Sequence, residues 1–143
     1  MPPNVAIFLP MAVVAAVSIV AFLKLFVARY KSVKKREVPL KYYVAFQGGG
    51  EPEEVAIASR HYLNVFESPV LFYAGCLAAN MVGAVSFPVL VAAWWYAGWR
   101  TIQSFIHLTS NTVRLRALAF VLAWIGLIAL WVLITVSVLG KIL

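Results

Sequence analysis

The stretch Ser59–Ala79, SRHYLNVFESPVLFYAGCLAA, decides the fold, because it places three polar side chains inside a segment that is otherwise apolar. These side chains are Arg60, Asn64 and Glu67. On a helix their spacing brings them to one face. Ionisable groups at membrane depth nearly always turn towards a bundle interior or a water-filled cavity, where they pair or bind a ligand. The stretch therefore predicts a membrane helix with one polar, functional face.

The composition of the whole chain agrees with a membrane protein. Of its 143 residues 64% are hydrophobic and 12% are charged, with a mean hydropathy of +0.92. A chain with these values is too apolar for a soluble domain. Strands that alternate apolar and polar residues, as a membrane β-barrel requires, are absent from the sequence. The net charge of +7 comes from basic residues beside apolar runs, so we expect a lipid bilayer and no nucleic acid as partner. The predicted class is an all-α integral membrane protein.

Long apolar runs, each of about 20 residues, match a hydrocarbon core of roughly 30 Å and divide the chain into four spans. We expect residues 1–143 to form a single domain, a four-transmembrane-helix antiparallel bundle with short connections. The expected spans are residues 5–30, 53–82, 88–108 and 117–140. Residues 31–52 hold two prolines and a triple glycine, so we expect a loop there, and residues 109–116 should form a polar connection.

The basic residues set the expected orientation. Most of them belong to the first loop or the third connection, which lie on the same side of a four-span topology; they are Lys31, Lys34, Lys35, Arg36, Lys41, Arg114 and Arg116. Only Lys141 lies near the opposite side. Because cytoplasmic loops are enriched in lysine and arginine, that side should be cytoplasmic. We therefore expect a multi-pass protein of a bacterial inner membrane, with both termini outside the cytoplasm.

A second polar stripe occurs in the third span. Arg100, Gln103 and His107 fall on one helical face, at a depth comparable to that of Glu67. Because an isolated charge in a membrane is costly, we expect Glu67 to pair with Arg100 or Arg60. One guanidinium then lacks a counter-charge, which a small anionic ligand would supply. The alternative is that these groups only join the helices. No second histidine, cysteine or carboxylate lies at a metal-ligand spacing from His107, so no metal is expected.

The two stripes carry a family resemblance. RHYLNVFESP at Arg60–Pro69 resembles the Arg-x-x-x-Asn-x-x-Glu-x-x-Pro signature of the MAPEG family, the membrane-associated proteins in eicosanoid and glutathione metabolism. Trp99–Thr109 and Arg114–Leu118 resemble the pattern of microsomal glutathione transferases. The resemblance implies a homotrimer that binds glutathione, as co-substrate, between subunits near the cytoplasmic face. The glutathione-binding residues that we expect are Arg29, Arg60, Asn64, Glu67, Arg100, Gln103 and His107.

Arg114 and Arg116 occupy the two spacings at which branches of the family carry the arginine that activates the thiol, and Arg114 is favoured. A nearby guanidinium would lower the thiol pKa from roughly 8.5 and populate the thiolate. The thiolate would then attack a lipophilic electrophile or hydroperoxide from the bilayer. His107 stands where the family has a tyrosine, and could itself accept the proton. Pro69 follows Glu67 by two residues where the family usually has three.

Two functions follow from this pattern. The first is a glutathione-dependent membrane transferase or peroxidase, and the second is a non-catalytic lipid-binding or scaffold protein of the same fold. A small multidrug exporter is a third compact four-helix protein with an intramembrane glutamate. It is disfavoured because the neighbouring arginines would hold Glu67 ionised, whereas a proton-coupled exporter needs a carboxylate that titrates.

Overall fold

Four long helices run through residues 3–46 and 50–143, which are the residues that this computed structural model describes. They are α2 (Phe8–Lys34), α4 (Glu53–Met81), α5 (Phe87–Leu108) and α6 (Val113–Ile142). There are also two four-residue helices in the described residues. Helix α1 (Pro3–Ala6) precedes α2, and α3 (Tyr42–Ala45) lies in the connection between α2 and α4. The described ranges contain no strand, so the predicted all-helical class is correct.

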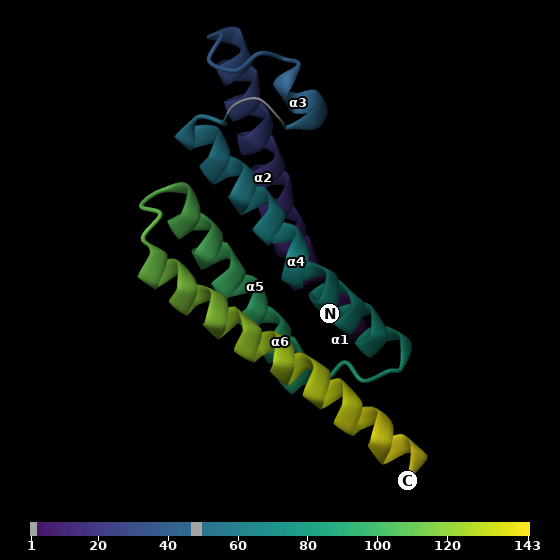
Figure 1. The fold of residues 1–143 in the computed structure, drawn as a ribbon. Coiled ribbons are helices and arrows are strands. Elements are labelled where there is room, and N and C mark those ends of the chain that lie inside the picture. The colour runs from purple at the N-terminus through teal and green to yellow at the C-terminus, as the bar shows by residue number, and fades with distance from the viewer. Residues whose placement is uncertain (1–2, 47–49) are drawn as a thin grey trace.

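The long helices form two pairs. Helix α2 packs against α4, and α5 packs against α6, while α5 also touches α2 and α4 (Figure 1). Successive long helices run in opposite directions, and both ends of the chain lie towards the end of the molecule that carries the α4–α5 turn. The α2–α4 and α5–α6 connections lie at the other end. This arrangement brings residues of α4, α5 and α6 together in the middle of the molecule.

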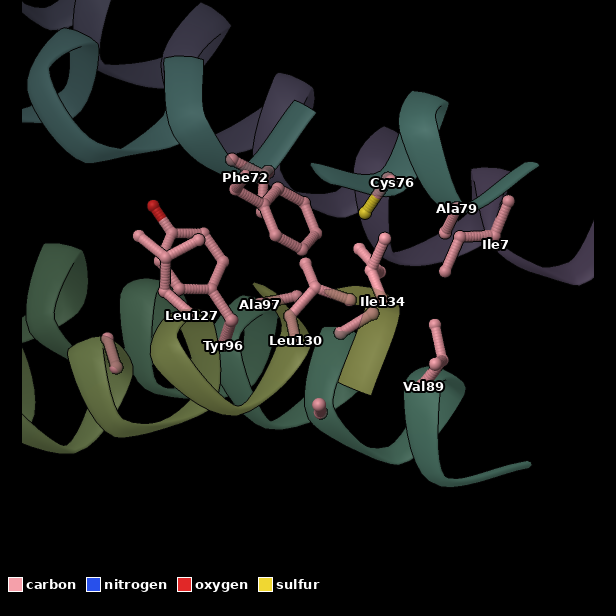
Figure 2. Packing of buried hydrophobic residues seen from close by; sticks show 14 residues of the cluster. Ile7, Phe72, Cys76, Ala79, Val89, Tyr96, Ala97, Leu127, Leu130 and Ile134 are labelled. Carbon is pink, nitrogen blue, oxygen red and sulfur yellow. The ribbon is translucent and has the colours of Figure 1, made fainter. Parts of the chain in front are cut away.

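The core lies between the two pairs. Phe72 and Cys76 of α4 point towards Tyr96 of α5 and towards Leu127 and Leu130 of α6 (Figure 2). The rings of Phe72 and Tyr96 stack with their centroids 4.4 Å apart. The Tyr96 hydroxyl lies 2.9 Å from the Ser68 hydroxyl, so its polar end is hydrogen-bonded although it is buried. The apolar part of the core thus ends at a polar pair on α4 and α5.

Gly126 allows α5 and α6 to approach closely. A Cβ atom at this position would lie 2.7 Å from Trp95 Cδ1 and 3.0 Å from the backbone nitrogen of Tyr96. The Trp95 indole is also held, because its Nε1 donates to the carbonyl of Leu122 at 2.8 Å. Small residues that let backbones come together are the usual device for packing membrane helices. Gly126 therefore sets the spacing of the α5–α6 pair.

We expect Gly126→Ala to destabilise the protein by about 1–3 kcal/mol, the usual effect of overpacking a tight contact. The matched control is Gly98→Ala, because a Cβ atom at Gly98 meets nothing within 4 Å. Thermal unfolding in detergent should show a lower midpoint for the first variant and an unchanged or slightly higher one for the second. Equal midpoints in the two variants would contradict the role given to Gly126.

Two helical segments of the described chain, Pro3–Lys34 and Val113–Ile142, are long and apolar enough to cross a membrane by length and composition. Helices α4 and α5 do not meet that criterion. They carry the two polar stripes, and these side chains lower the mean hydropathy of both segments. That α4 and α5 also cross the membrane therefore stays a prediction from the sequence.

Two helices extend beyond the expected membrane spans. Helix α2 continues past residue 30 to Lys34, and the first loop contains α3. The segment Lys31–Lys34 has no glycine or proline, so nothing ends the helix where its apolar run ends; the chain turns only at Arg36, whose φ is 59°. Helix α6 likewise begins at Val113, so the polar connection ends at Thr112 and not at residue 116.

Candidate functional site

The polar stripe of α5 faces the interior of the helix bundle, and its three side chains share one helical face, as their spacing predicted. Arg100, Gln103 and His107 are all buried, with exposed fractions of 3%, 5% and 4%. Arg100 is held by Asn64 of α4: Nη2 donates to the Asn64 backbone carbonyl at 2.7 Å and Nη1 to Oδ1 at 3.3 Å. Arg100 Nη1 also donates to Gln103 Oε1. These bonds join α4 to α5 at the centre of the predicted site.

The ion pair expected for Glu67 does not form. The described residues contain two ion pairs, Arg29 with Glu51 and Lys35 with Glu37. Glu67 and Arg60 both lie on the outward side of α4 and are exposed in the single chain, whereas Arg100 faces inward. Amide and carbonyl oxygens are therefore closer to Arg100 than the carboxylate is. Of the α4 stripe, Asn64 contacts Arg100, whereas Arg60 and Glu67 are exposed, so the prediction of this ion pair was wrong.

Asn64 lies at the boundary between these two surfaces. It is half-buried, its oxygens accept from Arg100, and Gln103 Nε2 approaches its Oδ1 at 3.4 Å. Arg60 and Glu67 lie on the same side of α4 but make no hydrogen bond or ion pair with other described side chains. The outward face of α4 thus presents a cation and an anion that have no hydrogen-bond or ion-pair partner within the described part of the chain.

Of the two candidate thiol-activating arginines, only Arg116 reaches this region. Its Nη1 donates to Asn111 Oδ1 at 2.9 Å and lies 3.3 Å from Nε2 of His107. With Asn64 and Gln103, it lines a small pocket of about 190 Å³. Arg114 is exposed and makes no side-chain hydrogen bond within the described ranges. Because α6 begins at Val113, the two arginines are held on a helix, where residues two positions apart point to different sides.

The sequence reasoning missed a second polar contact between α4 and α5. His61 is 2% exposed, its Nε2 lies 2.9 Å from the Ser104 hydroxyl, and its ring centroid is 4.7 Å from that of His107. The signal was present in the sequence, because His61, Val65, Ser68 and Phe72 share one helical face next to that of Arg60. That inner face reads as mostly apolar, so its histidine was not singled out.

Arg29 lies in a different environment, between α2, α3 and α4. Its Nη2 contacts Glu51 Oε1 at 3.4 Å and the Ser59 hydroxyl at 3.3 Å. Its guanidinium carbon lies 5.2 Å from the ring centroid of Tyr43, within cation–π range. Burial, and then the charge of Glu51, raises the pKa of Tyr43 above its ordinary value, so its hydroxyl stays protonated at neutral pH. The Arg29 guanidinium thus already has partners within the chain. A contact of Arg29 with glutathione stays a prediction.

Arg29 and Tyr43 also line a larger, mostly apolar pocket of about 450 Å³, whose walls include Phe22 and Phe26 of α2 and Tyr62 of α4. Its volume is in the range of pockets that hold drug-sized molecules. The pocket lies beside the first loop and is lined by residues other than those that surround Arg116.

In the comparison with protein families, the model of the MAPEG family matches residues 7–136. The chain belongs to the MAPEG family. Comparison with curated proteins and with solved structures finds no match. The matched range contains the four long helices almost completely, together with both polar stripes and the two arginines of α6. The resemblance predicted from the motifs is thereby confirmed, and the apolar helices and the family together identify a membrane protein.

Membership in the MAPEG family narrows the function without fixing it. The family contains glutathione transferases, peroxidases and non-catalytic members. The residues that we expected to bind glutathione lie in three places: on the outward face of α4, in the buried network of α5, and, for Arg29, beside the first loop. Only the first two groups meet, at Asn64.

Proposed function

We propose that this MAPEG protein is a glutathione-dependent membrane transferase or peroxidase that acts on lipophilic electrophiles. Glutathione binds between the subunits of a homotrimer on the cytoplasmic side, and an arginine of α6 stabilises its thiolate. The observation that carries the proposal is the outward face of α4, where Arg60 and Glu67 are exposed beside the Arg100 network.

The depth of these charges supports a site between subunits. At about 1.5 Å per residue, Arg60 lies roughly 10 Å and Glu67 roughly 21 Å along α4 from Glu53, the first residue of that helix. A charge at the centre of a membrane helix costs about 2.5–3.5 kcal/mol on insertion scales, so neither side chain is expected to face lipid. A zwitterionic tripeptide held against a neighbouring subunit supplies partners for both charges.

The size of the pocket supports the same arrangement. The space lined by Asn64, Gln103 and Arg116 is about 190 Å³ in one chain, below the roughly 300–1,000 Å³ of typical ligand pockets. A neighbouring subunit would close and enlarge it. If the trimer is needed for binding, the protein should lose glutathione affinity when the trimer dissociates. Calorimetry at detergent concentrations that shift the oligomeric state can measure this loss.

Arg116 is the arginine best placed for the chemistry. Its Nη1 is engaged by Asn111 and His107, while Nε and Nη2 make no hydrogen bond to described residues. Those N–H groups can donate to a thiolate, which lowers the thiol pKa from roughly 8.5 and gives a nucleophile at neutral pH. The role of the arginine is electrostatic, because a guanidinium does not give up its proton in this pH range. The thiol proton leaves to water, and the sulfur then forms a bond to the electrophilic carbon. The displaced electron pair departs with the leaving group or, in a conjugate addition, takes a proton from water.

A non-catalytic scaffold remains the second candidate, and one observation favours it. The two Nη atoms of Arg100 both donate within the chain, to Asn64 and Gln103, so this guanidinium already has acceptors before any ligand binds. The two functions are separated by ultraviolet absorbance of the purified trimer with glutathione. Bound thiolate indicates an enzyme, whereas glutathione bound only as thiol, or not bound, supports the scaffold.

The expected topology puts the first loop in the cytoplasm of a bacterium, with both termini across the inner membrane. Lys35 is exposed and Cys76, the only native cysteine, is buried. In a Cys76→Ala background, Lys35→Cys should therefore react with a membrane-impermeant maleimide only after the membrane is opened. The control, Leu143→Cys, should react in intact spheroplasts. The reverse labelling pattern would overturn the orientation.

A further inference from the structure

Three helices meet around His107 in a cluster that the chemistry above uses only in part. His107 of α5 lies between Arg116 of α6 and His61 of α4: its Nε2 is 3.3 Å from Arg116 Nη1, and its ring centroid is 4.7 Å from that of His61. His61 is tied to Ser104 at 2.9 Å. Both histidines are buried, with exposed fractions of 2% and 4%. The cluster is thus packed and hydrogen-bonded from α4 across to α6.

The donor and acceptor chemistry of this contact fixes the state of His107. Arginine has only donors, so Nε2 of His107 must offer its lone pair to Nη1. The imidazole is then neutral, with its proton on Nδ1. The guanidinium of Arg116, which contacts His107, also opposes a positive charge on this imidazole.

The same contact also determines how Arg116 is oriented. Nη1 carries two hydrogens, and the structure gives them two acceptors, His107 Nε2 and Asn111 Oδ1. Asn111 can take this position because its backbone is left-handed, with φ of 46°, a conformation that asparagine tolerates better than most residues. With Nη1 held by two acceptors, rotation of the guanidinium is restricted, and Nε and Nη2 make no hydrogen bond to the described residues.

We propose that His107 is a positioning residue for Arg116: as a neutral Nδ1–H imidazole it holds Nη1 and thereby keeps the guanidinium aimed at the glutathione thiol. This inference rests on the proposed function, because it requires Arg116 to act on the thiol. His107 then acts through Arg116 and not by touching the tripeptide. His61, which is hydrogen-bonded to Ser104, packs against the His107 ring.

The first test compares two variants of the intact trimer, with glutathione as the probe. His107→Gln keeps an acceptor near the position of Nε2, and His107→Phe keeps a flat ring but removes the acceptor. We expect His107→Phe to lower the thiolate fraction of bound glutathione at pH 7 about three- to tenfold, the effect of one lost hydrogen bond, with binding within about threefold. His107→Gln should retain most of the thiolate. A titration curve of thiolate absorbance that is the same for His107→Phe and the wild type overturns the inference.

A double-mutant cycle separates positioning from a general loss of packing. In an Arg116→Ala background, His107→Phe should change the thiolate titration no further, because the group that it positions is gone. An equal, additive shift in both backgrounds overturns the inference and leaves the proposed function intact. A wild-type trimer that binds glutathione only as thiol overturns the proposed function and this inference together.

A further measurement needs no variant. Nitrogen NMR of the trimer with ¹⁵N-labelled histidine should show His107 as a neutral ring with its proton on Nδ1, assigned by loss of its signals in His107→Gln. A proton on Nε2 would leave no lone pair for Arg116 and would overturn the inference. Asn111→Gly, which keeps the left-handed backbone and removes the other acceptor, should lower the thiolate fraction by a similar factor.

Discussion

Arg116→Ala should bind glutathione nearly as well as the wild type and yet raise the pKa of the bound thiol by about one to two units, which is about ten- to a hundredfold less thiolate at neutral pH. The reason is geometric. Arg116 lies on the first turns of α6, is held by Asn111 and His107, and lines the pocket beside Asn64. Its loss would remove the positive charge that we propose to lie beside the sulfur, but none of the contacts that we propose between α4 and the tripeptide.

Arg114→Ala is the matched control, since it removes the same charge two residues away on the same helix. Its side chain is exposed and makes no hydrogen bond to the described residues, so the thiol pKa should not change. Both variants are read by thiolate absorbance against pH, with calorimetry as the check on binding. A shift in Arg114→Ala alone would restore the preference that the sequence suggested. No shift in either variant would favour the scaffold.

Arg60→Ala should have the opposite profile, with glutathione affinity reduced and the thiol pKa little changed. A charge-assisted hydrogen bond contributes about 1.5–3 kcal/mol, so the dissociation constant should rise by roughly ten- to 150-fold. Arg60 is exposed on α4 and has no partner among the described side chains, so its loss leaves no buried acceptor unpaired inside the subunit. The folded subunit should therefore remain stable.

Arg60→Leu distinguishes a ligand-facing from a lipid-facing position. If Arg60 faced lipid, leucine would be strongly favoured there and the thermal midpoint should rise. If it faces glutathione and a neighbouring subunit, leucine should abolish the stabilisation that glutathione gives and should weaken the trimer. Leu63, an exposed apolar residue on the same helix, provides the control as Leu63→Val. Unfolding midpoints with and without glutathione decide between these outcomes.

The all-helical class was predictable because long apolar runs and helical spacing indicate helices, although α4 and α5 carry polar stripes that lower their mean hydropathy. The same spacing correctly placed Arg100, Gln103 and His107 on one buried face. Spacing shows which residues share a face, but it does not show what that face contacts. For this reason the stripe of Arg60 and Glu67 was expected to face Arg100, and the structure places it on the outside.

The choice between Arg114 and Arg116 depended on information that a sequence motif lacks. Residues two positions apart on a helix point in nearly opposite directions. The choice therefore requires knowing that both residues are already helical and how α6 is rotated against α5. His61 was missed for a related reason, because a single histidine among apolar neighbours is recognised only when Ser104 and His107 are seen next to it.

The uneven apolarity of the four long helices has a consequence for how the chain enters a membrane during synthesis. Helices α2 and α6 are long and apolar enough to cross a membrane by length and composition, whereas α4 and α5 do not meet that criterion. The hydrogen bonds from Arg100 of α5 to Asn64 of α4 pair polar groups of these two less apolar helices with each other. Helices α4 and α5 should therefore leave the translocon together, as a hairpin joined at its polar centre, beside an α2 that is already anchored. A ribosome stalled before α5 has emerged should leave α4 accessible to water.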